Sequence, residues 1–260
     1  MDHTFVVCAY KENPYLEKCI QSVLNQTKKS NVLISTSTPN EYIKQIAGKY
    51  NLKLVINEGA GDEADNFNFA YSQAQSKYVT LCHQDDYYSI DYLKYIEKAE
   101  KRHKNTIIFF TDYFEDRSNH IIKVNFLLLI KRILLFPLRF DCFSKSIKLR
   151  SFILSLGNPI CCPSVTYNKS VISSPGYEIA YRAVLDWKVW IRLSKYAGSF
   201  CYIAKPLVYH RIHDDSETSK TIQNNSRSKQ ELEVYQEMWP KWMASILKRI
   251  YGNAQKNNKL

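Results

Sequence analysis

Strand-type and helix-type segments alternate four times in the first ~115 residues, and this alternation limits the fold more than any other feature of the sequence. Short β-branched and aromatic runs without a helical period predict buried strands at 4–10, 31–36, 52–57, 77–82 and 106–115. The intervening segments, which carry helix signals such as apolar residues at helical spacing, are 12–27, 39–50, 66–75 and 89–103. This order predicts an α/β fold: a Rossmann-like, mostly parallel sheet with helices on both faces.

Four side chains stand at the ends of successive predicted strands. They are Tyr10, Thr36, Asn57 and Asp85. In open parallel sheets, ligands bind beyond the carboxyl ends of the strands. We therefore expect these four residues to line one edge of the sheet, where a ligand would bind.

Two adjacent carboxylates, Asp85 and Asp86, end the fourth predicted strand in a chain whose net charge is +11. Carboxylate oxygens are the ligands that Mg²⁺ and Mn²⁺ prefer, and such an ion would in turn bind substrate phosphates. An ordinary alternative is that the pair caps the helix that follows, whose dipole favours acids at its start. The pair alone does not separate these readings.

The positive charge is concentrated in the second half of the chain. Residues 1–120 hold 14 Lys/Arg and 16 Asp/Glu, a net of −2, whereas residues 121–260 hold 22 and 9, a net of +13. This asymmetry favours an anionic membrane or an acidic ligand, and no motif of a nucleic-acid-binding domain is present. Seven cysteines without a Cys-x-x-Cys pair argue against a zinc site or a disulfide framework and fit a reducing cytosol.

The apolar stretch at 121–140 is interrupted by Lys131 and Arg132 near its middle, so we do not expect it to span a bilayer. From 121 to 160 there are seven Lys/Arg against Asp141 alone. On a helical wheel the basic side chains lean away from the apolar side. The sequence indicates a basic amphipathic helical insert, 121–156, that binds an anionic membrane surface. Packing on the protein core or on another subunit is the alternative.

Four stretches resemble glycosyltransferase family 2 of the GT-A fold, in the order that the family has them. The first two are VVCAYKENPYLEKCIQSVLNQT and the segment from NEGAG to NFNFAYSQAQSKYVTLCHQDD. The others are NPICCPSVTYNKS and the segment that runs from LDW to YHRIHDDSET. The likeness covers residues 4 to about 218. It implies a GT-A fold that holds a sugar nucleotide at the strand ends.

The resemblance also implies roles for residues. Asp85 and His213 match metal ligands for Mn²⁺ or Mg²⁺, Asp186 matches the general base, and Trp187 lies on the acceptor side. The residues expected along the nucleotide-sugar donor are Ala9, Tyr10, Glu12, Thr36, Asn57, Asn66, His83, Gln84 and Asp86. The chain departs from the family pattern at His83, Asp65 and Leu185, and it has no acid after the second strand.

The function that the resemblance implies is inverting, metal-dependent transfer of one sugar. The donor expected first is a UDP-sugar, and the acceptor is a hydroxyl of a glycan or lipid-linked molecule in bacterial capsule or lipopolysaccharide synthesis. The motif of processive polymerising relatives is missing. We expect a cytoplasmic enzyme, peripheral at the inner face of the plasma membrane, that binds no nucleic acid and is compatible with a homo-oligomer. The alternative is a catalytically silent nucleotide-sugar-binding or scaffold protein.

The expected organisation is one GT-A domain with a tail. The GT-A domain is expected at 1–218 and a helical tail at 219–260. Within the domain we expect a nucleotide-sugar half at 1–118, an amphipathic helical insert at 119–157 and an acceptor half at 158–218. Pro240 predicts a kink in the tail.

Overall fold

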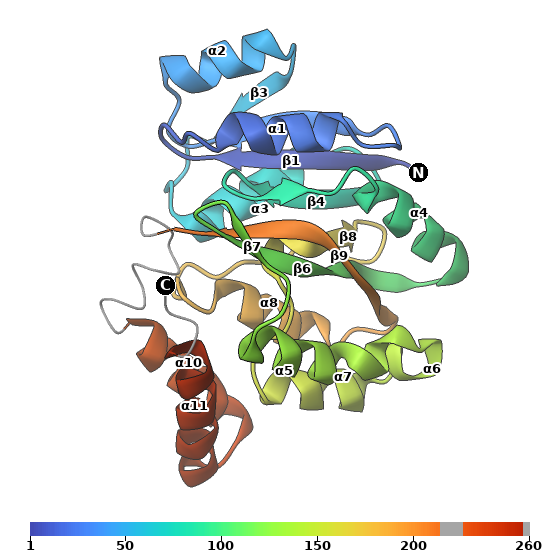
Figure 1. Cartoon of the computed structure of the whole chain (residues 1–260), viewed down its shortest axis with the longest axis vertical. Helices are drawn as coiled ribbons and strands as arrows, with labels where there is room; N and C mark the ends of the chain where they lie inside the picture. The colour runs from blue at the N-terminus through green and yellow to red at the C-terminus, as the bar shows by residue number, and fades with distance from the viewer. Residues whose placement is uncertain (214–225, 257–260) are drawn as a thin grey trace.

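The computed structural model describes residues 1–213 and 226–256, and these residues form a nine-stranded mixed sheet with helices on both faces (Figure 1). The strands are β1 (His3–Ala9), β2 (Asn31–Thr36), β3 (Lys53–Ile56), β4 (Tyr78–His83), β5 (Tyr87–Tyr88), β6 (Thr106–Arg117), β7 (His120–Ile122), β8 (Val165–Asn168) and β9 (Ser199–Ile212). The expected α/β fold is confirmed.

The strand order determines at which edge of the sheet a ligand could bind. The order is β3-β2-β1-β4-β8-β6-β9-β5, with β7 paired to β6. Strands β3, β2, β1 and β4 are parallel, and β8 is antiparallel between β4 and β6. The register pairs Ala9 with Thr36, Thr36 with Ile56, and Cys8 with His83. The carboxyl ends of these four strands therefore meet at one edge, as the sequence predicts.

Alternating side chains of β1 divide the core into two layers. Phe5 and Val7 pack with α1 (Leu16–Leu24), α2 (Glu41–Lys49) and α4 (Tyr92–Arg102). Val6 points the other way, into the cluster that holds α3 (Glu63–Gln73) and α8 (Leu185–Leu193). Because successive side chains of a strand face opposite sides, a continuous apolar strand requires helices on both faces.

The predicted insert is helical, and three of its cations face inward. Its elements are α5 (Phe126–Leu135), η1 (Phe136–Arg139), α6 (Asp141–Ser144) and α7 (Ile147–Ser155), which lie together at one side of the molecule (Figure 1). Lys131 donates to the Tyr113 hydroxyl at 3.0 Å, and Arg132 pairs with Asp112 at 2.8 Å. Arg150 is fully buried. The basic side of α5, which the helical wheel separates from its apolar side, therefore faces the protein at Lys131 and Arg132.

Arg150 stabilises the end of α8. Its guanidinium donates to the carbonyls of Ser194 at 2.9 Å and Tyr196 at 2.8 Å, and also to those of Gly198 and Ser144. Carbonyls at a helix C-terminus lack partners within the helix and carry partial negative charge, so a cation is favoured there. This contact fixes α7 against α8.

The outer face of the insert is apolar. Phe126 and Ile133 are 59% and 63% exposed, and Phe136, Phe140 and Phe143 are each about half exposed. Within residues 1–213 and 226–256, no helix combines the length and apolar character that crossing a bilayer requires.

The C-terminal helices α10 (Ser226–Met238) and α11 (Lys241–Lys256) pack beside the insert and α8, with Pro240 in the break between them. Tyr235 and Tyr251 close over Gly157, whose φ of +150° disfavours other residues. A Cβ at Gly157 would lie 2.9 Å from the Tyr251 ring. Residues 219–225 and 257–260 of the predicted tail lie outside the described residues.

Replacement of Arg150 by methionine tests its structural role. The change leaves buried carbonyls without a donor, so we expect it to lower the free energy of unfolding by about 3 kcal/mol and the melting temperature by roughly 6–12 °C. Lys148→Met, on the exposed side of α7, is the matched control and is expected to change stability by less than about 0.5 kcal/mol. Thermal and urea denaturation measure both. Equal stability of the two variants would contradict the assignment.

Candidate active site

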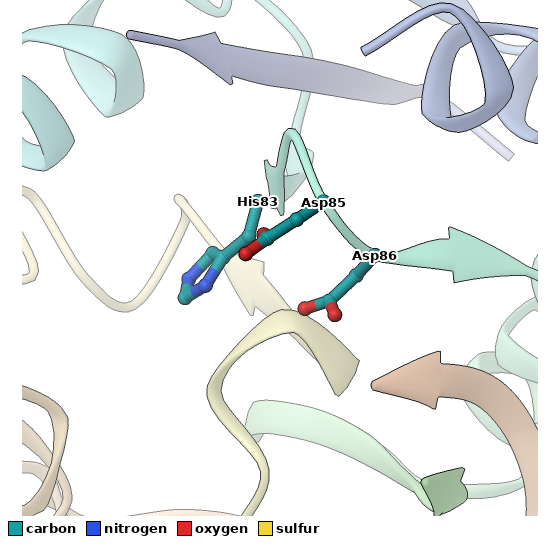
Figure 2. A group of neighbouring side chains, drawn as sticks. All are labelled: His83, Asp85 and Asp86. Atoms are coloured by element: carbon teal, nitrogen blue, oxygen red, sulfur yellow. The ribbon is translucent and has the colours of Figure 1, made fainter. Parts of the chain in front are cut away.

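The acidic pair and one imidazole form a compact cluster on the turn after β4. His83, Asp85 and Asp86 each offer one ligand atom, and these atoms lie within 4.8 Å of one another. The three side chains extend to the same side of the turn (Figure 2). Imidazole nitrogen and carboxylate oxygens so close together are suited to a divalent cation.

Asp86 is the anchored member of the cluster. Its side chain is buried, and Oδ1 accepts hydrogen bonds from the Arg211 backbone N–H at 2.8 Å and from His210 Nδ1 at 3.0 Å. Burial acts to lower the pKa of His210, but the carboxylates of Asp86 and Asp85 outweigh it and raise that pKa. The resemblance places Asp86 along the donor, and the structure shows that β9 holds its carboxylate in the turn.

Asp85 faces the end of β9. Its Oδ2 lies 3.0 Å from His213 Nε2, and its backbone carbonyl accepts from Arg211 Nε at 3.0 Å. Burial acts to raise the pKa of Asp85, but the hydrogen bond to His213 and the nearby imidazoles His83 and His210 leave it below the ordinary value. Asp85 and His213, both expected to bind metal, are thus in direct contact.

The donor set fits a divalent cation. His83 Nε2 is buried and has no hydrogen-bond partner among the described residues. The ring stacks on Phe67 at 5.1 Å, which fixes its orientation. A buried nitrogen without a partner is costly unless a ligand satisfies it. His83, Asp85 and Asp86 would hold the ion.

The loop after β1 is tied to the same turn. Tyr10 N–H donates to Gln84 Oε1 at 2.8 Å, and Gln84 Nε2 donates back to the Tyr10 carbonyl at 3.0 Å. Ala9 is buried, whereas Glu12 is exposed. The Gln84 side chain therefore positions the loop that is expected to bind the donor, and both of its amide atoms already form hydrogen bonds with Tyr10.

Asn57 and Asn66 build the loop after β3. Asn57 Nδ2 donates to Asp65 Oδ2 at 2.8 Å and to Asn66 Oδ1 at 2.9 Å, and Asn66 Nδ2 donates to the Gly61 carbonyl. Thr36 is buried and its hydroxyl accepts from Thr38 N–H. Asp65, a departure from the family pattern, has a structural partner here. These expected donor residues shape the edge chiefly through bonds within it.

The candidate base lies in the first turn of α8. Asp186 Oδ2 accepts from Asn158 Nδ2 at 2.8 Å, and Oδ1 accepts from the Trp187 backbone N–H at 2.8 Å. Two hydrogen bonds thus fix the Asp186 carboxylate at the start of α8.

Trp187 has a packing role. Only 1% of it is exposed, its indole N–H donates to the Leu154 carbonyl at 2.9 Å, and its ring packs on Tyr235. This burial counts against the expected contact of Trp187 with an acceptor, because the ring presents no surface to a substrate.

The C-terminal helices support the base. The Tyr251 hydroxyl donates to the Asn158 carbonyl at 3.2 Å, and Gln230 accepts from the Ala183 N–H at 2.9 Å. Arg227, which pairs with Glu231 at 2.9 Å, lies within electrostatic range of Asp186. Helix α11 therefore holds the segment of Asn158, and α10 holds the segment just before Asp186.

Sequence reasoning missed three residues of this site: Asn158, His210 and Arg211. All three stand inside the stretches that resemble the family, two beside His213 and one at the start of NPICCP. Their positions in those stretches were the available signal.

Comparisons with known proteins show the family and the fold. Residues 4–159 match the family described as Glycosyl transferase family 2. The fold is similar to that of S. aureus TarS residues 1–349 in complex with UDP-GlcNAc, at 14% identity and a TM-score of 0.64, covering 100% of this chain and 74% of that one. It is also similar to the mannosyltransferase PcManGT of Pyrobaculum calidifontis in complex with GDP-Man and Mn²⁺, at 12% identity and a TM-score of 0.65, covering 95% and 69%. No curated protein matches the sequence significantly.

The likeness to these structures confirms the expected GT-A fold. The family match extends over more than half of the sequence and includes the cluster after β4. The chain therefore belongs to glycosyl transferase family 2.

Proposed function

We propose that this glycosyltransferase moves one sugar, with inversion, from a nucleotide-diphosphate sugar to a hydroxyl of a glycan or lipid-linked acceptor in bacterial surface polysaccharide synthesis. A UDP-sugar is the donor that we test first. The observation that carries the proposal is the cluster of His83, Asp85 and Asp86 at the carboxyl edge of the parallel strands, in a chain that matches the family over residues 4–159. TarS, in complex with UDP-GlcNAc, shares this fold and supports the donor class.

The donor half of the mechanism rests on fixed groups. Asp85 and Asp86 with His83 would hold Mn²⁺ or Mg²⁺, which would supply positive charge for the leaving diphosphate. Asp86 keeps the turn in place through β9, and His213 holds the Asp85 carboxylate. The loop at Tyr10, tied to Gln84, lines the nucleotide.

The acceptor half rests on Asp186. The acceptor oxygen attacks the anomeric carbon while its proton passes to the Asp186 carboxylate, and the bond from that carbon to the diphosphate oxygen breaks. Asn158 and the Trp187 N–H orient the carboxylate. One displacement without a covalent enzyme intermediate inverts the anomeric configuration.

Replacement of Asp186 by asparagine tests the base. The amide keeps the shape but accepts no proton, so we expect kcat to fall about 10²- to 10⁴-fold with little change in donor affinity. The measurement is sugar transfer from a panel of UDP- and GDP-sugars to candidate acceptors. Glu178→Gln, an exposed acid-to-amide change nearby, is the control. Wild-type transfer that D186N leaves unchanged refutes the base assignment, and binding of the donor without any transfer favours the silent alternative.

Metal dependence is tested by binding as well as activity. We expect Mn²⁺ with UDP or GDP to raise the melting temperature of the wild-type protein, because a ligand that binds only the folded state stabilises it. Asp85→Asn removes one anionic ligand and is expected to lower the affinity for Mn²⁺ at least about tenfold. Chelation by EDTA is expected to abolish both the shift and transfer. Equal nucleotide binding with and without the ion would contradict metal dependence.

The insert is the proposed membrane contact, through its outer face: Phe126, Ile133, Phe136, Phe140 and Phe143. These side chains are roughly half exposed or more. The exposed cation Arg139 lies among them in the sequence, and Lys145 and Lys148 follow Phe143. Exposed aromatic rings next to cations suit the headgroup boundary of an anionic bilayer. This surface would place the enzyme at the inner face of the plasma membrane, beside a lipid-linked acceptor.

Liposome flotation tests that surface. We expect the wild-type protein to float with vesicles that contain anionic lipid, and a variant with Phe136, Phe140 and Phe143 all changed to serine to remain at the bottom, since each ring contributes buried apolar area. Melting temperature controls for folding. If the wild-type protein does not float and instead forms dimers that the same variant dissolves, the surface binds a second copy and the membrane proposal is wrong.

A further inference from the structure

The whole net charge of the chain lies in two segments. Residues 121–160 hold seven Lys/Arg against one acid, and residues 239–260 hold five Lys/Arg and no acid. Their combined net charge of +11 equals that of the whole chain, so the remaining residues are neutral in sum. The first segment contains the insert. The second contains helix α11, which packs against α5 of the insert at the end of the molecule opposite α2 and β3 (Figure 1).

Helix α11 has one covered face and one exposed apolar face. Ala244 and Tyr251 are buried and belong to the hydrophobic core, so the covered face is fixed against the protein. Trp242, Ile246 and Ile250 are 64%, 51% and 60% exposed. Residues four apart are neighbours on the surface of a helix. These three side chains therefore form one exposed row, here called the α11 stripe.

The charge of the segment favours lipid as the partner of the α11 stripe. Large apolar side chains gathered on an exposed surface mark a contact with protein or with lipid. Lys241 and Arg249 are also exposed on α11, and cations beside an apolar helix face attract anionic headgroups. An exposed indole suits the boundary between headgroups and acyl chains. A second copy is less suitable, because a twofold contact would bring together two surfaces of the same charge.

We propose that the α11 stripe is a second membrane-binding surface, which inserts Trp242, Ile246 and Ile250 into the headgroup boundary of a bilayer that contains anionic lipid. The inference rests on the proposed peripheral location of the enzyme and adds a surface to the outer face of the insert. The covered face of the same helix holds the Asn158 carbonyl through Tyr251. The bilayer contact is thus made by the helix that also supports the partner of the candidate base.

Trp242 reports the contact directly, because it is the exposed tryptophan of the chain. Trp187 and Trp190 are buried, and Trp239 is half-buried with its indole N–H bonded to the Ser155 carbonyl. The wild-type protein is mixed with vesicles of phosphatidylcholine and phosphatidylglycerol that carry bromine on their acyl chains. Bromine quenches an indole that lies in the bilayer. We expect quenching of the wild type and much less quenching of Trp242→Phe, which keeps an apolar ring and still binds.

Vesicle flotation of variants separates the α11 stripe from the insert. Serine at positions 242, 246 and 250 is expected to weaken binding to anionic vesicles at least about tenfold, since three apolar side chains lose their burial. The matched control carries serine in place of exposed apolar residues outside both segments and is expected to bind as the wild type does. The residues changed in it are Leu24, Ile90 and Ile179. Melting temperature shows whether both variants fold.

Three results would overturn the proposal. They are a wild-type protein that does not bind anionic vesicles, a folded stripe variant that binds them as the wild type does, and quenching of W242F that equals that of the wild type. If the wild type forms dimers that the stripe variant dissolves, and vesicles bind neither protein, the stripe binds a second copy instead. If the stripe variant does not fold, the quenching comparison between the wild type and W242F decides.

Failure of the other proposals gives different results. If the variant at Phe136, Phe140 and Phe143 binds vesicles and the stripe variant does not, the α11 surface stands and the contact through the insert is wrong. No donor is present in these experiments. A protein that binds vesicles through the stripe but transfers no sugar from any donor therefore retains this surface and refutes the proposed transferase function.

Discussion

The buried carboxylate of Asp86 is the contact on which the active site depends. A charge that is 1% exposed is stable only when donors surround it, and β9 supplies them through the Arg211 N–H and His210. The bond joins the turn after β4 to a strand more than a hundred residues later in the chain. It also sets the direction of the adjacent Asp85, whose carboxylate meets His213. The candidate metal cluster therefore depends on the assembled sheet, because the turn alone does not hold Asp86 in place.

The sheet edge at which the parallel strands end was predictable from sequence, because the residues that mark each strand end are local to it. Buried parallel strands are short apolar runs, and the polar residue that follows each run marks an end. The inward cations of the insert were not predictable in this way. A helical wheel separates the apolar from the basic side of α5 but does not say which side the protein covers. In the structure, Lys131 binds Tyr113 and Arg132 pairs with Asp112, so the basic side of α5 faces the protein. Phe126 and Ile133, on the apolar side, are exposed.

In the site itself, the family motifs identified Asp85, His213 and Asp186 as candidates, and the first two are in contact. Asn158 was missed as the partner of Asp186 because the two are 28 residues apart and their hydrogen bond forms only after α7 and α8 pack. Trp187 shows the reverse error. Its place next to the base in sequence suggested a substrate contact, but successive helical residues point in different directions, and the ring turns into the core.

The candidate base is held by a part of the chain that lies beyond the family match. That match ends at residue 159, whereas Asp186 is oriented by Asn158, whose carbonyl is held in turn by Tyr251 of α11. Displacement of a catalytic group by about 1 Å can cost orders of magnitude in rate. The C-terminal helices therefore help to position the candidate base. The same logic applies to the insert, whose Arg150 fixes the end of α8. Elements outside the parallel strands thus hold the candidate base in place.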